Sequence, residues 1–174
     1  MDEKAARIAT VCECIDHCFA FEVWCRDFAQ HEDPDEMVIG LGRGHELVSD
    51  ATLLLSFLAL RRVDEFLRGK RSNADDLIAS DIGIDPANVI CPKMGSFLTK
   101  AERTNINKGA AHLTQWLMLD ADSEVDLAEI VIRSVPTFTR LTAELRANDD
   151  AGEAARWLDG TDELLAGMAP PRPS

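Results

Sequence analysis

Hydrophobic positions recur every three or four residues along most of the chain, which is the repeat of an amphipathic α-helix. In the first thirty residues the apolar positions that follow this repeat are Ile8, Val11, Ile15, Cys18, Phe19, Phe21, Cys25 and Phe28. No stretch shows the strict alternation of apolar and polar residues that is typical of a half-buried strand. The pattern therefore predicts an all-α protein.

Capping and breaking residues set the ends of the predicted helices. Pro34 follows the first helix, Gly69 stops the second, and a capping box at 99–102 begins the third. The expected helices span about 2–31, 46–68, 99–119, 123–147 and 149–168, with a short one near 74–80. Pro136 falls inside the fourth long helix and should kink or split it. We expect an antiparallel helical bundle of five to six helices.

The length of 174 residues suits one helical domain over 1–168, with a proline-rich disordered tail at 169–174. The segment 51–60 is apolar on nearly every side, which places it at the centre of the bundle or at a subunit interface. We therefore expect a homodimer. This apolar run is too short to cross a bilayer, and the N-terminus lacks a signal-peptide pattern. These features predict a cytoplasmic protein with no membrane association.

Charge narrows the choice of partners. The net charge of −13 argues against a general nucleic-acid binder, because a phosphate backbone would be repelled on average. The distribution is uneven: residues 61–108 carry nine basic and seven acidic side chains, and the remainder carries nine and twenty-four. The middle of the chain is thus the part able to present a local positive surface. Cations that end a helix, at 61–71, are the simpler explanation.

The segment 40–45 is a glycine-rich connection that departs from the dinucleotide-binding fingerprint, since no strand precedes it. We expect it to be a loop. Arg43 and His45 stand beside the predicted start of a helix, where an anion or nucleotide could bind. Asn107, in the third long helix, is the further residue expected in this binding role.

Five cysteines, an odd number, do not indicate a disulfide framework. On a helix Cys14, Cys18 and Cys25 share one stripe with His17 beside it, and Cys12 lies nearby. One hypothesis is a zinc or haem site. The other is buried packing, which we favour because a single helical stripe supplies too few ligands at good distance. We expect neither a metal nor a cofactor.

The segment 105–114 combines side chains of different chemistry on one predicted helical face. Asn105 and Lys108 precede His112 by seven and four residues, which brings all three to the same side of a helix. Arg103 falls on the opposite side. Gly109 indicates close approach of another backbone or room for a ligand. A histidine hydrogen-bonded at a helix–helix contact is the structural alternative.

The residues 107–114, late in a helical chain and after an apolar helix that ends at 66–70, resemble the HEPN-like helical superfamily. The resemblance is closest to its abortive-infection branch and to related uncharacterised bacterial proteins. It covers about residues 5–145, and His112 matches the histidine of the family motif. Asn105 stands where the family has arginine. The resemblance implies a dimeric, metal-independent endoribonuclease whose two motifs face one another.

Three functions follow as expectations. In a ribonuclease, His112 would act as general base and its symmetry mate as general acid, while Lys108 stabilises the phosphate and Asn105 orients it. Such a protein would serve in defence or as a toxin, with RNA and an antitoxin-like protein as partners. The alternative is a non-catalytic dimeric bundle that acts as an interaction or structural protein. A third is nucleotide or small-anion sensing between Arg43, His45 and the motif helix.

Overall fold

The structure is a computed structural model and describes residues 1–30, 43–71, 73–90, 97–111 and 126–168. Within these ranges the regular secondary structure consists of helices. The elements are α1 (Glu3–Cys18), α2 (Ala20–Gln30), α4 (Arg43–Leu67), the 3₁₀-helix η1 (Ala79–Ile82), α5 (Pro86–Val89), α6 (Lys100–Ala111), α8 (Leu127–Ala147) and α9 (Ala155–Met168). These residues contain no strand, so the all-α prediction is confirmed for them.

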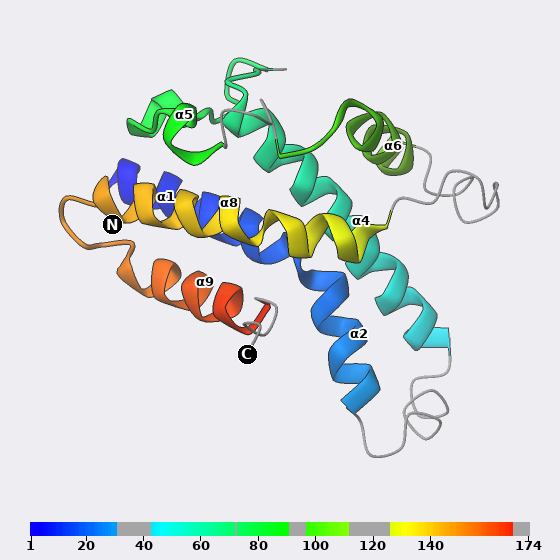
Figure 1. Cartoon of the computed structure of the whole chain (residues 1–174). Helices are drawn as coiled ribbons and strands as arrows, with labels where there is room; N and C mark the ends of the chain where they lie inside the picture. Colours follow the sequence, from blue (N-terminus) through cyan, green and yellow to red (C-terminus); the bar gives the residue numbers. More distant parts are fainter. Residues whose placement is uncertain (31–42, 72, 91–96, 112–125, 169–174) are drawn as a thin grey trace, which may run out of the picture.

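The helices α1, α8 and α9 lie side by side, with α8 antiparallel to the other two, and α4 crosses this group (Figure 1). The helix α6 packs on α4. The helix α2 and the N-terminal half of α4 extend away from the group as a pair, which we call the arm (Figure 1). Burial is sparse there: no residue of α2 is fully buried, nor is any described side chain of α4 before Ser56.

Aromatic packing joins distant segments in the core. The ring of Phe138, on α8, is fully buried and meets Phe19 and Phe97 edge-on, with ring centroids 5.8 and 5.5 Å apart. Phe19 lies between α1 and α2, and Phe97 precedes α6. In the arm, Trp24 and Phe28 of α2 form a tilted ring pair with centroids 6.3 Å apart. The core thus holds α8 to both the α1–α2 junction and the approach to α6.

The single helix predicted over 2–31 is wrong, because the chain bends at Phe19. The N–H of Phe19 donates to the Asp16 carbonyl three residues back, at 3.0 Å, which tightens the last turn of α1. The N–H of Phe21 then donates to the hydroxyl of Ser56, a fully buried residue of α4, at 3.1 Å. A side chain from another helix therefore replaces the carbonyl that a continuous helix would supply.

The second helix is as predicted at its end and longer at its start. It ends at Leu67, and Gly69 has the positive φ of 62° that the C-terminal stop requires. It begins at Arg43 rather than near Glu46, so the loop predicted over 40–45 is wrong from Arg43 onward. Residues 40–42 lie outside the described part.

Between α4 and α6 the short helix stands later than predicted. It is η1 at 79–82 rather than a helix near 74–80, and Gly83, with φ 80°, turns the chain after it. Asp85 then caps α5 by accepting the N–H of Ala87 at 2.9 Å.

The helix α8 runs through Pro136 as one element, so the predicted split does not occur. Its described start is capped by Asp126, which accepts the N–H of Glu129 at 2.8 Å. The last helix begins at Ala155 rather than Asp149, because Gly152 (φ 67°) turns the chain and Asp149 accepts the N–H of Ala154 at 2.9 Å. The start predicted at 123 and the tail at 169–174 lie outside the described residues.

Candidate functional site

The helix α6 carries the motif, and its first turn has the predicted capping box. The N–H of Thr99 donates to the Glu102 carboxylate at 2.7 Å, and the N–H of Glu102 donates to the Thr99 hydroxyl at 3.2 Å. Both orphan donors at the helix start are thereby satisfied.

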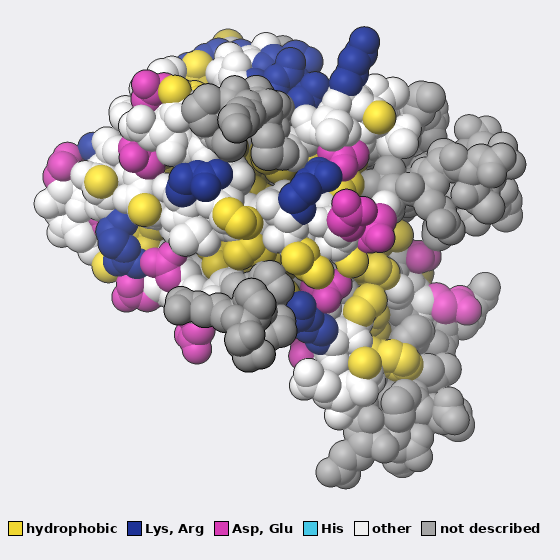
Figure 2. Space-filling model, in the orientation of Figure 1, with side chains coloured by type: hydrophobic (Ala, Val, Ile, Leu, Met, Phe, Trp, Pro, Cys, Tyr) yellow, Lys and Arg dark blue, Asp and Glu magenta, His cyan; other side chains and the backbone are white. Residues whose placement is uncertain are grey.

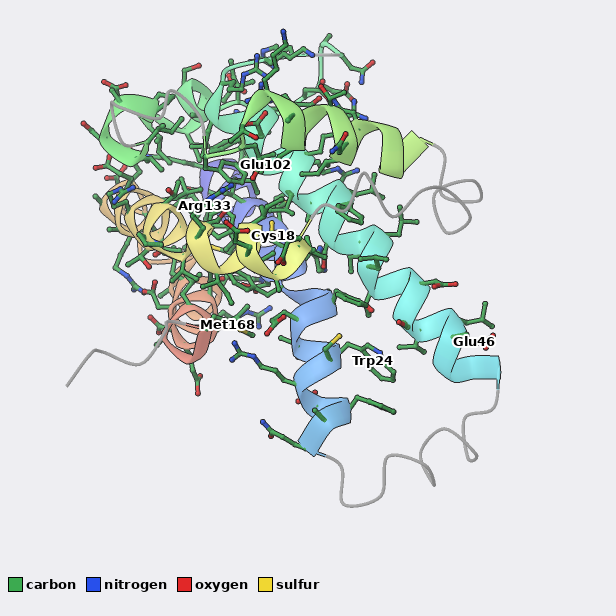
Figure 3. All side chains as sticks on the ribbon, turned by 45° about the vertical axis from the view of Figure 1, so that its right-hand side comes forward. Cys18, Trp24, Glu46, Glu102, Arg133 and Met168 are labelled. Carbon is green, nitrogen blue, oxygen red and sulfur yellow. The ribbon has the colours of Figure 1, made fainter. Side chains whose placement is uncertain are left out.

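Glu102 also ties α6 to α8. Its other oxygen accepts a hydrogen bond from Arg133 at 2.8 Å, and both residues are labelled in Figure 3. Burial alone would raise the pKa of Glu102, but the hydrogen bonds from Thr99 and Arg133 outweigh it and the pKa is lowered. The start of α6 is therefore held by an ionised carboxylate.

Arg103 anchors the same turn to α4. Its Nε lies 2.6 Å from Asp64, whose side chain is 2% exposed, and its Nη2 donates to the Leu98 carbonyl at 3.1 Å. Arg68 approaches the same carboxylate at 3.4 Å. Arg103 thus faces α4. Its expected place on the side of α6 opposite His112 stays a prediction, because His112 lies outside the described residues.

The motif residues follow on the same helix. Ile106 is buried against the core, Asn105 is half-buried and Asn107 is exposed. The backbone stays helical through Lys108, which puts Lys108 one turn after Asn105. The side chain of Lys108 and the whole of His112 lie outside the described residues. Convergence of the three side chains stays a prediction.

Arg43 and His45 belong to the first turn of α4 rather than to a loop. This turn is at the far end of the arm (Figure 1). Arg43 lies 21 residues before Asp64, or about 30 Å along the helix axis. Arg43 and the anchored first turn of α6 therefore do not share one site. The side chains of Arg43 and His45 lie outside the described part, so binding of an anion by these two residues stays a prediction.

The cysteines of the first two helices differ in exposure. Cys12 and Cys18 are buried, Cys14 is half-buried and Cys25 is exposed. Burial raises the pKa of the Cys12 thiol to about 12. Cys12 and Cys18 therefore pack in the core, as expected. The expectation of buried packing is wrong for Cys25, which is exposed. No group of three His, Cys, Asp or Glu within the described ranges has an arrangement that could hold a metal ion.

The outer face of α4 presents an apolar stripe that we call the seam: Val48, Ala51, Leu55 and Leu58. The three larger members are 38%, 36% and 37% exposed, and Leu47 beside them is 68% exposed. Four of the five large exposed hydrophobic residues in the described ranges therefore belong to α4.

The other side of the same helix is buried, at Ser56, Phe57, Leu60 and Val63. On the face in Figure 2, hydrophobic side chains continue from the body onto the arm between α2 and α4. The segment 51–60 is thus covered on one side only. The spacing of three, four and three residues along the seam is visible in the sequence, whereas its exposure is seen only in the structure.

Comparison with known proteins gives no match to a family, to a curated protein or to a solved structure. No helix in the described ranges is both long and apolar enough to cross a membrane.

Proposed function

We propose that the protein is a self-associating helical interaction protein, and that the seam of α4 is the surface through which two copies pair. The observation that carries this proposal is the exposure of Leu55 and Leu58 on a helix whose opposite side is already buried. A helix that is apolar on both sides needs cover on both sides. A second copy of the seam supplies that cover.

The seam is self-complementary when two copies run antiparallel. Its members are placed symmetrically about position 53, so Val48 meets Leu58 of the second copy and Ala51 meets Leu55. Each contact occurs twice, as a twofold interface requires. The small Ala51 gives room to the larger Leu55 opposite it.

The length of the seam sets the expected strength of the dimer. Ten residues of helix extend about 15 Å. A contact of that length buries less surface than the roughly 800 Å² per partner of a standard interface. We therefore expect dissociation in the micromolar range, and an association that depends on protein concentration.

Sedimentation equilibrium over a range of concentrations tests the proposal. The wild-type chain should shift from its monomer mass of 19.2 kDa towards twice that value. The double variant Leu55→Glu/Leu58→Glu should remain monomeric, because unpaired carboxylates would be buried at the interface. The double variant Ala29→Glu/Gln30→Glu adds the same two negative charges at exposed sites on α2 and should dimerise normally. A wild type that stays monomeric at all concentrations contradicts the proposal.

A second candidate is RNA cleavage by a HEPN-like antiparallel bundle in the cytoplasm. It is favoured by the anchoring of α6, whose first turn is fixed to α4 by Arg103 and to α8 by Glu102. A helix held in this way can present Asn105 and the following motif residues in a constant orientation. Attack of a ribose 2′-hydroxyl on the adjacent phosphate would use His112 as base and Lys108 as the charge on the phosphate.

An assay on mixed RNA in the presence of a chelator tests this second function. Wild-type protein should cleave, and His112→Ala should abolish cleavage. His17→Ala removes an exposed histidine of α1 and is the matched control. Cleavage that survives His112→Ala, or absence of cleavage by the wild type, excludes this role for the motif.

A further inference from the structure

A pocket of 280 Å³ lies on the side of the molecule where α1 meets the end of α4 and the segment that follows α4. Its apolar floor consists of Val11, Val63, Phe66 and Leu77. The first three are buried side chains that also belong to the core. The pocket therefore has a fixed apolar base rather than one made of surface chains.

Two cations on the wall of this pocket have no carboxylate partner among the described residues. They are Arg62, on α4, and Lys70, just after it. The neighbouring Glu65 does not neutralise them, since its carboxylate is held by Arg61 at 3.1 Å.

The adjacent pocket gives the contrast. Both pockets are lined by Thr10, Asp75, Asp76 and Leu77. The arginines that line only the adjacent pocket already have carboxylate partners: Arg7 pairs with Glu3, and Arg71 pairs with Asp81. Free positive charge is thus a property of the first pocket. It indicates an anionic group on the ligand.

One carboxylate in the lining of the first pocket also has no partner among the described residues. Asp75 is exposed and accepts no hydrogen bond from the described residues, whereas Asp76 already accepts the N–H of Asn73 at 2.6 Å. The first pocket therefore offers unpaired charges of both signs above an apolar floor.

We propose that this pocket binds a free hydrophobic amino acid. Its carboxylate lies against Arg62 and Lys70, its ammonium lies against Asp75, and its side chain rests on the floor formed by Val11, Val63, Phe66 and Leu77. The volume is close to the lower end of the range for ligand pockets, about 300–1000 Å³, which suits an amino acid better than a nucleotide. This proposal is independent of dimerisation and of RNA cleavage.

The thiol of Cys14 lines the same pocket and supplies a readout in the intact protein. Alkylation of Cys14 is followed by mass spectrometry with and without ligand, and the exposed Cys25 of α2 serves as internal control. Leucine at about ten times its Kd should slow alkylation of Cys14 about tenfold and leave Cys25 unchanged. Absence of protection at about 10 mM leucine, where even a millimolar site would be filled, overturns the proposal.

Two analogues of leucine separate the roles of the charges. Leucinamide lacks the carboxylate and should give no protection, and 4-methylpentanoate lacks the ammonium and should protect less than leucine. Equal protection by leucine and leucinamide overturns the assignment to Arg62 and Lys70. Equal protection by leucine and 4-methylpentanoate overturns the assignment to Asp75.

Variants complete the test. Lys70→Gln and Arg62→Gln should each weaken protection by leucine, while Arg7→Gln, in the adjacent pocket, should not. Since Arg62 also donates a hydrogen bond to the Cys14 thiol, each variant is compared with itself in the absence of ligand. Thermal unfolding of each variant shows whether it is folded. Undiminished protection in a folded Arg62→Gln/Lys70→Gln double variant overturns the proposal.

Discussion

Asp64 is buried, with 1% of the whole residue exposed, and its main partner is Arg103 on another helix. Removing that arginine by Arg103→Ala leaves a buried carboxylate that has lost its closest cation. We expect a loss of about 3 kcal/mol in the free energy of unfolding. Urea denaturation measures it.

Arg68→Ala is the matched control, because Arg68 approaches the same carboxylate at 3.4 Å from a more exposed position. Its loss should be below about 1 kcal/mol. Equal losses for Arg103→Ala and Arg68→Ala would mean that Arg103 is not the anchor of α6.

The partner of Arg103 could not be predicted from the sequence, because Asp64 stands 39 residues earlier on a helix whose crossing with α6 no local pattern specifies. The same holds for the cysteines: one stripe was visible in the sequence, but Cys18 is buried and Cys25 is exposed since α1 and α2 diverge.

The bend between α1 and α2 depends on one hydroxyl. Ser56→Ala removes the acceptor of the Phe21 N–H and should cost about 1–3 kcal/mol, the usual penalty for an unsatisfied, partly buried donor. Chemical denaturation measures the loss.

Ser134→Ala is the control for Ser56→Ala, since the hydroxyl of Ser134 is equally buried but donates to the Ile130 carbonyl of its own helix. Its removal leaves no backbone donor unpaired, so its cost should be smaller. A larger loss for Ser134→Ala than for Ser56→Ala would contradict this account of the bend.

The start of α6 should be sensitive to acid. Because the pKa of Glu102 is lowered in the folded protein, its contribution is present above its unfolded value near 4.5 and is lost as the pH falls through the folded pKa. The difference in Tm between wild type and Glu102→Gln should therefore be largest at neutral pH and shrink in acid. Thermal unfolding from pH 7 to pH 3 measures it.

Thr99→Ala removes the reciprocal cap and should cost about 1 kcal/mol in the free energy of unfolding at neutral pH.

A difference in Tm between wild type and Glu102→Gln that grows as the pH falls would contradict an ionised Glu102.

The helix ends that depend on neighbouring residues were predictable, and those that depend on other helices were not. The capping box at Thr99 and the stop at Gly69 are local signals, and both are confirmed. The break at Phe19 is imposed by Ser56, so periodicity alone predicts one continuous helix. Similarly, the apolar spacing near Asp149 does not reveal that Asp149 closes a turn instead of opening a helix.

At the scale of the whole molecule, Phe138 connects α8 with the α1–α2 junction and the approach to α6. Phe138→Ala should cost about 3–5 kcal/mol, because it removes a fully buried ring and leaves a cavity. Denaturant unfolding measures this loss. Leu47→Ala, at a position 68% exposed, should change stability by less than about 0.5 kcal/mol. A small loss for Phe138→Ala would mean that the core can close around the missing ring.

The helical class of the molecule follows from its hydrophobic repeat, whereas the arm does not. Periodicity identifies which side of a helix is apolar, but not whether another helix covers it. For the segment 51–60 the sequence allowed two positions, the centre of the bundle or a subunit interface. In the structure one side of this segment is buried and the other is exposed. The meeting of His112 with Asn105 and Lys108 concerns residues outside the described part and stays a prediction.

The sparse burial of the arm has a consequence for how the protein opens. Regions with few buried contacts exchange their amide hydrogens through local fluctuations that cost less than global unfolding. Amides of α2 should therefore exchange before those of α1 and α8, although α2 directly continues the chain of α1. Trp24 lies on this helix, Trp157 lies on α9, and the third tryptophan of the chain, Trp116, lies outside the described residues. In a Trp116→Phe background, tryptophan emission would then distinguish loosening of α2 from melting of the remaining protein.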